Sequence, residues 1–232
     1  MTRIAPRTSS DLPRAGFLAL ASDELHALFG TLAKPISIAD GEILFHEGDK
    51  GEALFAVTSG ALEISVLSSD GRKLSLDVMK SGSVLGEIAL FDQGPRTATI
   101  TALEPSTLLM FKAGDVLDAV ERQPLLALDL VRLAGQRMRW MNQQLSEQVF
   151  LPLPARLARK IIYLMNGVPE GQSLAFSQGE LADFVGSTRE AVSKTLSTWR
   201  KAGIVSLSRG RLRVEESEAL EMMAGIDAKK SA

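Results

Sequence analysis

The hydrophobic pattern of this chain changes once, near Gly114, and that change restricts the fold more than any other feature of the sequence. From residue 36 to residue 111, short apolar runs alternate with glycines, many of them eight to twelve residues apart. Such punctuation is typical of short antiparallel strands joined by tight turns. From Asp115 the apolar spacing is helical for about thirty residues. The sequence therefore predicts an α+β chain in which a small barrel or sandwich precedes a long helix.

The clearest strands are predicted at residues 62–66 and 74–78, where apolar and polar residues alternate. This alternation predicts that one face of each strand is buried and the other is exposed. Ser68-Ser69-Asp70-Gly71 predicts a hairpin turn between them, because Asp-Gly favours positive φ angles. The other elements predicted in this half are strands at residues 97–102 and 107–111 and a short helix at residues 17–32.

The long helix is interrupted near its start by Pro124 and carries a regular apolar seam. The seam residues are spaced alternately four and three apart: Ala127, Val131, Ala134, Met138, Met141 and Leu145. This is the spacing of a coiled-coil interface. The seam could pack on its own domain, but we predict that it pairs with a second copy of the chain, because a small barrel has little surface to cover so long a helix. Residues 150–154, Phe-Leu-Pro-Leu-Pro, end the helix and predict a hinge.

The segment after the hinge has the pattern of a winged helix-turn-helix. Pro154 suits the first position of a helix. Two capping boxes, Ser177-x-x-Glu180 and Ser187-x-x-Glu190, each predict the start of a further helix, with a turn at Gly186 between them. Helices are predicted at residues 155–166, 178–185 and 188–202, and a hairpin wing is predicted at residues 204–207 and 212–214.

Charge divides the chain at the same hinge. Residues 151–213 carry ten Lys and Arg against four Asp and Glu, whereas residues 1–150 carry fourteen against nineteen. A basic back half beside an acidic front half predicts that only the back half binds a polyanion. Ordinary surface variation is the alternative explanation.

In a helix-turn-helix, the second helix enters the major groove of DNA with its N-terminus first. The side chains predicted to face base edges are Thr188, Arg189, Glu190, Ser193 and Lys194. The side chains predicted to contact phosphates are Ser187 at the cap and Arg209 and Arg211 on the wing. The alternative is a solvated helix start in which Glu190 only closes a capping box, but the basic surroundings favour double-stranded DNA.

A second candidate site lies at residues 84–90, Val-Leu-Gly-Glu-Ile-Ala-Leu, together with Arg96. Gly86 permits close backbone approach, and a helical turn after it would present backbone amides. Arg96 is the only cation among apolar and hydroxylic neighbours. Amides and a guanidinium together suit a cyclic phosphate diester, while Glu87 could accept from a sugar hydroxyl. The alternative is a structural ion pair of Arg96 with Asp92 or Glu87.

These motifs make the sequence similar, over residues 17–214, to the cyclic-nucleotide-responsive branch of the Crp/Fnr family of bacterial transcription regulators. The resemblance rests on G-E-I-A-L-x4-P-R-T-A-T from Gly86 and on G-S-T-R-E-A-V-S-K from Gly186. It implies a β-roll, a long dimerisation helix and a winged helix-turn-helix, with RNA polymerase as a further partner. The implied ligand contacts are Glu87 to the ribose hydroxyl, Arg96 and the amides of Ile88 and Ala89 to the cyclic phosphate, and Thr97 beside phosphate or base.

The resemblance also implies palindromic operators of the TGTGA…TCACA type, read by Arg189, Glu190 and Lys194. Lys194 replaces the arginine that is usual in the family, which changes the base contact available at that position. Relatives that bind cyclic AMP carry a Thr-Ser pair on the long helix, where this chain has Met141 and Asn142.

Two residues bear on the identity of the base, and together they do not select a single nucleotide. The amide of Asn142 could donate to guanine or accept from adenine. Thr97 is the residue type that favours guanine in eukaryotic cyclic-nucleotide modules. We expect cyclic AMP as the effector, and cyclic GMP is the alternative.

Composition argues against other classes. The chain has no cysteine, and its two histidines, His26 and His46, have no metal-ligand spacing, so no metal, redox centre or enzymatic activity is expected. A cupin-type metal enzyme would need a histidine cluster around His46. No window approaches the roughly eighteen apolar residues of a membrane span, so a cytoplasmic protein without membrane contact is expected.

Two alternatives share parts of this pattern. A nucleotide-gated kinase subunit or channel domain would have the phosphate motif but would lack the helix at residues 187–194 and the basic back half. A regulator of the same family could be constitutive or answer a non-nucleotide effector. The expected organisation is a flexible N-terminal arm at residues 1–16, a cyclic-nucleotide-binding β-roll at 17–113, a dimerisation helix at 114–150, and a winged helix-turn-helix domain with a C-terminal tail at 151–232.

Overall fold

The structure of the chain is a computed structural model that describes residues 13, 18–19, 21–92, 94–166, 168 and 171–226. The chain divides into two compact units. We call Met1–Val66 with Leu76–Trp140 the front unit, and Leu67–Ser75 with Met141–Ala232 the back unit. The predicted N-terminal arm lies outside the described residues except for Pro13.

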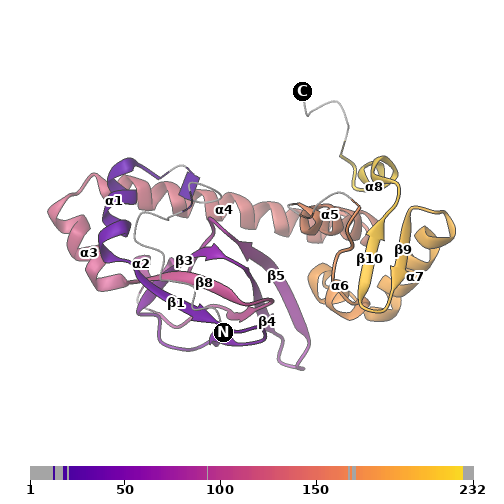
Figure 1. Cartoon of the computed structure of the whole chain (residues 1–232), viewed down its shortest axis with the longest axis horizontal. Helices are drawn as coiled ribbons and strands as arrows, with labels where there is room; N and C mark the ends of the chain where they lie inside the picture. The colour runs from indigo at the N-terminus through magenta and orange to yellow at the C-terminus, as the bar shows by residue number, and fades with distance from the viewer. Residues whose placement is uncertain are drawn as a thin grey trace. The chain divides into compact units, whose positions relative to one another are not determined.

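Two four-stranded sheets, with the orders β1-β8-β3-β6 and β2-β7-β4-β5, contain most of the strand residues and belong to the front unit except for the hairpin residues Leu67–Ser75 (Figure 1). The strands are β1 (Lys34–Ile38), β2 (Ile43–Phe45), β3 (Ala53–Ser59), β4 (Ala61–Leu67), β5 (Lys73–Lys80), β6 (Val84–Leu85), β7 (Thr99–Ala102) and β8 (Ser106–Lys112). Both sheets contribute to one apolar core, in which Phe55 and Leu108 of the first sheet are buried with Ile64 and Ile100 of the second. This arrangement confirms the predicted β-roll.

The hairpin between β4 and β5 closes as its sequence predicts. Gly71 has a φ of +80°, and the Ser68 N–H donates to the Arg72 carbonyl at 2.9 Å. The prediction of an exposed polar face on these strands is wrong, because Glu63 and Asp77 are each only 4% exposed. Asp77 accepts a hydrogen bond from the Val78 N–H at 2.8 Å. Alternation within a strand identifies its two faces, but it carries no information about what covers the polar one.

Three helices pack on the other face of the first sheet: α1 (Asp23–Leu32), α3 (Ala113–Arg122) and the first turns of α4 (Leu126–Phe150) (Figure 1). Phe29 of α1 stacks on Phe111 of β8 with ring centroids 4.5 Å apart. Helix α1 begins later than the predicted residue 17, because the Ser22 hydroxyl caps it by accepting from the Leu25 N–H at 3.1 Å.

Helix α4 begins after Pro124, as predicted, and presents much of its apolar seam to solvent. In the single chain, Val131 is 65% exposed, Met138 65%, Met141 55% and Leu145 63%. Apolar side chains that remain exposed along one stripe mark a surface that contacts another macromolecule.

The back unit has the predicted helix-turn-helix and wing (Figure 1). Its elements are α5 (Leu153–Met165), α6 (Gln178–Val185), α7 (Arg189–Lys201), β9 (Val205–Ser208), β10 (Arg211–Val214) and α8 (Ser217–Met223). The capping box of Ser177 with Glu180 is complete, and Gly186 ends α6 with a φ of +60°. Helix α8 was not predicted, and α5 begins two residues before the predicted start because Pro152 already has the extended backbone of an N-cap.

Two arginines of α5 tie the elements of the back unit together around the predicted hinge. Arg156 donates from Nη1 to the carbonyls of Gln148 at 3.3 Å and Leu151 at 3.0 Å, and from Nη2 to the Val185 carbonyl at 3.2 Å. Arg159 joins the Glu147 carboxylate, 3.0 Å away, to the Ala224 carbonyl, 2.6 Å away. The carbonyls at the ends of α4 and α6 therefore gain side-chain donors that the helices themselves cannot supply.

Candidate ligand pocket and nucleic-acid interface

The backbone of Arg96 is fixed by the turn that follows β2. Its N–H donates to the Asp49 carbonyl at 2.7 Å, and its carbonyl accepts from the Gly48 N–H at 2.8 Å. Lys50 and Pro95 form an isolated bridge beside these two bonds. A loop residue held on both sides in this way presents its side chain in a defined direction.

The side chain of Arg96 turns inward and is only 9% exposed. Nη2 donates to the Ala53 carbonyl at 2.8 Å and Nη1 to the Gly86 carbonyl at 3.4 Å, while Nε is buried without a hydrogen-bond partner. Among the described residues no carboxylate forms an ion pair with this guanidinium. Burial lowers the pKa of Arg96, and the charges of Asp49 and Glu87 partly oppose that shift. A buried cation with an unsatisfied donor is a site where an anion is favoured.

Gly86 and Glu87 lie beside this guanidinium. Gly86 has a φ of +73°, and a Cβ there would lie 2.5 Å from Nη1 of Arg96 and 2.9 Å from the Ala53 carbonyl oxygen, so the position has no room for a side chain. Glu87 precedes α2 (Ile88–Phe91) and makes no side-chain cap. The first amides of α2, including those of Ile88 and Ala89, have no acceptor within their own helix.

Most of the predicted ligand residues line one cavity. Gly86, Glu87, Ile88, Arg96 and Thr97 all border it, and the space inside it is about 60 Å³. Apolar side chains form the rest of the wall, among them Phe45, Ile64, Leu85 and Ile100. Apolar walls with a few convergent polar groups are the usual lining of a small-molecule site.

Arg137 of α4 also lines the cavity, although it is not among the ligand residues predicted from the sequence. Its guanidinium lies 3.5 Å from the Glu87 carboxylate and 4.4 Å from the ring centroid of Trp140. Nothing in the sequence separates Arg137 from Arg132 and Arg139, which are exposed on the same helix. The distinction comes only from the direction in which α4 presents each side chain.

Asn142, the remaining predicted ligand residue, is exposed on α4 and is not among the residues that line the cavity. A role for Asn142 toward the base therefore stays a prediction.

The predicted second capping box is wrong by one residue. Helix α7 begins at Arg189, and its N-cap is Thr188, whose hydroxyl accepts from the Ala191 N–H at 3.2 Å. Ser187 instead donates its N–H to the Ala182 carbonyl at 3.0 Å, as part of the turn after Gly186. Glu190 is consequently the second residue of the helix and does not close a capping box, which removes the structural role considered for it above.

The hydroxyl of Thr188, and not that of Ser187, is expected to stabilise α7. Replacing Thr188 with alanine is expected to cost about 1 kcal/mol of stability, because it leaves the Ala191 N–H without its cap. Ser187→Ala is the matched control and should cost less than about half of that, since its side chain does not cap the helix. The measurement is urea unfolding of the back unit followed by Trp199 fluorescence in a Trp140→Phe background. Equal losses in the two variants would contradict the assignment.

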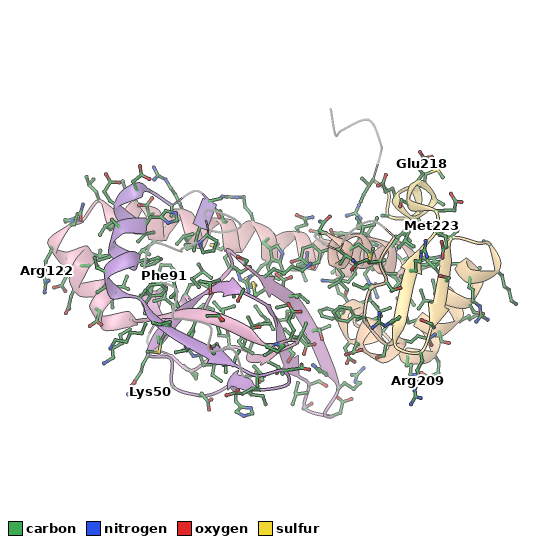
Figure 2. The ribbon with its side chains drawn as sticks, viewed as in Figure 1. Lys50, Phe91, Arg122, Arg209, Glu218 and Met223 are labelled. Carbon is green, nitrogen blue, oxygen red and sulfur yellow. The ribbon has the colours of Figure 1, made fainter. Side chains whose placement is uncertain are left out.

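The exposed side of α7 and the wing carry the predicted DNA contacts. Val192, Leu196 and Trp199 bury one side of α7, while the other side presents the predicted contacts Arg189, Glu190 and Lys194 as exposed and Ser193 as half-buried. Arg189 shares an open groove of about 450 Å³ with Arg209 and Arg211 of the wing. Figure 2 shows the Arg209 side chain pointing outward from the end of the wing. Basic side chains of α7 and of the wing thus line one groove of the back unit, as expected for a nucleic-acid interface.

Other kinds of site are not found in the part of the chain that the structure describes. Over these residues, no helix has both the length and the apolar character needed to cross a membrane. In the same residues, no group of three or more histidine, aspartate or glutamate side chains is placed to hold a metal ion.

Comparison with known proteins identifies a domain in each half of the chain. A model of the cyclic nucleotide-binding domain matches residues 35–123, and a model of the Crp-like helix-turn-helix domain matches residues 155–223. The cyclic AMP receptor protein of Thermus thermophilus is 32% identical over 185 residues, which cover 79% of this chain and 85% of that protein. A CRP-like cAMP-activated global transcriptional regulator of Mycobacterium tuberculosis is 28% identical over 219 residues, covering 92% of this chain and 98% of that protein.

A solved structure supports the fold. It is a transcriptional regulator of the CRP/FNR family from Thermus thermophilus, which superposes with a TM-score of 0.72 at 22% identity and covers 83% of this chain and 98% of its own. The Mycobacterium relative and this solved structure are both named as transcription regulators, not as enzymes. With a nucleotide-binding domain, a Crp-like helix-turn-helix and relatives matched over most of their length, the chain belongs to the Crp/Fnr family of transcription regulators.

Proposed function

We propose that this chain is a regulator whose sequence-specific binding to DNA depends on a cyclic nucleotide. The observation that carries the proposal is Arg96, a guanidinium that is 9% exposed, has an unsatisfied Nε and faces no paired carboxylate among the described residues. Such a group stabilises a bound phosphate far more than a solvated arginine would, because the charge has already lost its water.

The residues around the cavity fit a cyclic nucleotide. Arg96 and the amides of Ile88 and Ala89 would hold the cyclic phosphate, and Gly86 leaves the backbone room to approach it. Glu87 would accept from the ribose hydroxyl, and its contact with Arg137 would orient the carboxylate. Thr97 would lie beside the phosphate or the base.

For the base we propose cyclic AMP, with cyclic GMP as the weaker ligand. The names of two relatives refer to cyclic AMP, which supports adenine. Asn142 would donate to or accept from the base edge when the nucleotide is bound. Thr97 keeps guanine as the alternative.

The working form would be a homodimer that pairs through the exposed seam of α4. Burying Val131, Met138, Met141 and Leu145 against their copies would remove from water the large apolar side chains that are exposed in one chain. A dimer would also present two α7 helices about 34 Å apart, one turn of DNA, to the two halves of a palindrome.

On DNA, we propose that Arg189, Glu190 and Lys194 read a TGTGA-type half-site, with Thr188 and Ser193 close to the same bases. Ser187, Arg209 and Arg211 would contact phosphates. Residues 17–113 would bind the nucleotide, residues 114–150 would form the dimer, and residues 151–232 would bind DNA. The protein would act in the cytoplasm, with RNA polymerase as a partner.

Calorimetry with cyclic AMP and cyclic GMP on the full chain tests the ligand half of the proposal. We expect saturable binding of cyclic AMP and weaker binding of cyclic GMP. The second candidate, a regulator of this family that is constitutive or answers a non-nucleotide effector, predicts heat from neither nucleotide and DNA binding that neither changes.

A further inference from the structure

The guanidinium of Arg96 lies on an aromatic ring. Its Cζ is 4.1 Å from the ring centroid of Phe45 and 5.8 Å from that of Phe55. The two rings are tilted by 32° with centroids 5.9 Å apart. Phe45 is half-buried and lines the cavity, whereas Phe55 is part of the apolar core. Phe45 is therefore the ring in contact distance of the cation and of the space that a ligand would enter.

Phe45 and the backbone support of Arg96 come from one short segment. Phe45 ends β2 and pairs with Ile100 of β7. The turn directly after it supplies the Gly48 N–H and the Asp49 carbonyl that bond the Arg96 backbone. The same five-residue stretch thus bonds the main chain of Arg96 and places a ring against its guanidinium.

The face and the edge of a guanidinium serve different partners. The face is attracted to an aromatic ring, whereas the N–H donors all point outward in the plane. In this structure the edge donates to the carbonyls of Ala53 and Gly86, and Nε has no acceptor. A phosphate that enters the cavity could replace these carbonyl oxygens as acceptor through a small shift of the N–H groups, while Cζ stays over the Phe45 ring.

We propose that Phe45 is a positioning residue for phosphate recognition: its ring holds the Arg96 guanidinium at the wall of the cavity, where its N–H donors can bond a phosphate. This role rests on the proposed function, because it concerns the same phosphate. A guanidinium held in its binding orientation before the ligand arrives loses less conformational freedom on binding.

The first test compares Phe45→Leu with Phe45→Tyr by calorimetry with cyclic AMP. Leucine keeps most of the apolar volume but has no π face, so affinity is expected to fall about 3- to 30-fold, the range of a partly buried cation–π contact. Tyrosine keeps the face and should stay within about threefold of the wild type. Unchanged binding by Phe45→Leu would overturn the proposal. Tighter binding would also overturn it, because it would show that the ring holds Arg96 away from the ligand.

A double-mutant cycle separates positioning from packing. In an Arg96→Gln background, Phe45→Leu should produce almost no further loss of affinity, because the group that it positions is already gone. An undiminished 3- to 30-fold loss in that background would assign Phe45 to general packing and overturn the proposal.

A third measurement does not depend on nucleotide binding. The Nε–Hε signal of Arg96 in the ligand-free protein, identified by its absence in Arg96→Gln, should be shifted upfield by the ring current of Phe45 and should move downfield in Phe45→Leu. A signal that does not move overturns the proposal even where cyclic AMP binds normally. Failure of the wild type to bind either nucleotide would instead overturn the proposed function and, with it, the role toward phosphate.

Discussion

Arg96→Ala is expected to weaken cyclic AMP binding by about 100-fold or more. The guanidinium would supply at least two charge-assisted hydrogen bonds to the phosphate from a position that is only 9% exposed, and together these are worth about 3 kcal/mol or more. Calorimetry measures the loss. Arg96→Lys keeps the positive charge but loses the planar fork and its stacking on Phe45, so it should lie between wild type and alanine.

Two controls accompany this prediction. Arg72→Ala removes an exposed arginine from the β4–β5 hairpin, where it pairs with Asp70, and should leave cyclic AMP binding unchanged. Thermal unfolding checks that Arg96→Ala still folds, since the substitution also removes the donor to the Ala53 carbonyl. A folded Arg96→Ala protein that binds cyclic AMP with undiminished affinity would show that the phosphate does not bind at this guanidinium.

Arg189→Ala is expected to reduce binding to a TGTGA palindrome by about 10- to 100-fold at fixed salt. A bidentate contact from arginine to guanine is worth about 1–3 kcal/mol of discrimination, and the exposed first residue of α7 is placed to make one in each half-site. On random DNA of the same length the loss should be only a few-fold, because the base contact is absent there. Fluorescence anisotropy with both DNAs measures the difference.

Arg209→Ala is the matched control for Arg189→Ala. Both arginines line the same open groove of the back unit, but Arg209 lies on the wing, where a phosphate contact is expected. Its loss should weaken binding to both DNAs by similar factors and reduce the salt dependence by about one counterion per half-site. If Arg189→Ala behaves in the same way, Arg189 contacts phosphate only and the proposed base readout is wrong.

The parts of the fold that the sequence predicts well are those with a local cause. Asp70-Gly71 sets its turn through local backbone preference and through side-chain hydrogen bonds among Ser68, Asp70 and Arg72. The capping box of Ser177 with Glu180 sets the first residue of α6. Boundaries set by competition between neighbours are predicted less well. Ser187 and Thr188 are both good caps, and only the turn after Gly186 decides that Thr188 takes the role.

The residues of the ligand cavity also divide into those with a local signal in the sequence and those without one. Gly86, Glu87 and Arg96 can be predicted because each has a chemical role visible in its own residue type and spacing. Arg137 and Phe45 could not be predicted, since an arginine on a long helix and a phenylalanine at the end of a strand are ordinary in those places. They reach the cavity through the tertiary packing of α4 and β2, which no local pattern describes. The buried Glu63 is the converse case, a polar residue whose environment contradicts its strand pattern.

The central claim is that a nucleotide in the front unit controls DNA binding by the back unit. It is tested most directly by titrating the full chain onto a fluorescent TGTGA palindrome without nucleotide, with cyclic AMP and with cyclic GMP. The account predicts tighter binding with saturating cyclic AMP by roughly 5- to 150-fold, the usual range of allosteric coupling, and a smaller gain with cyclic GMP. Equal affinity for the palindrome under all three conditions would contradict it.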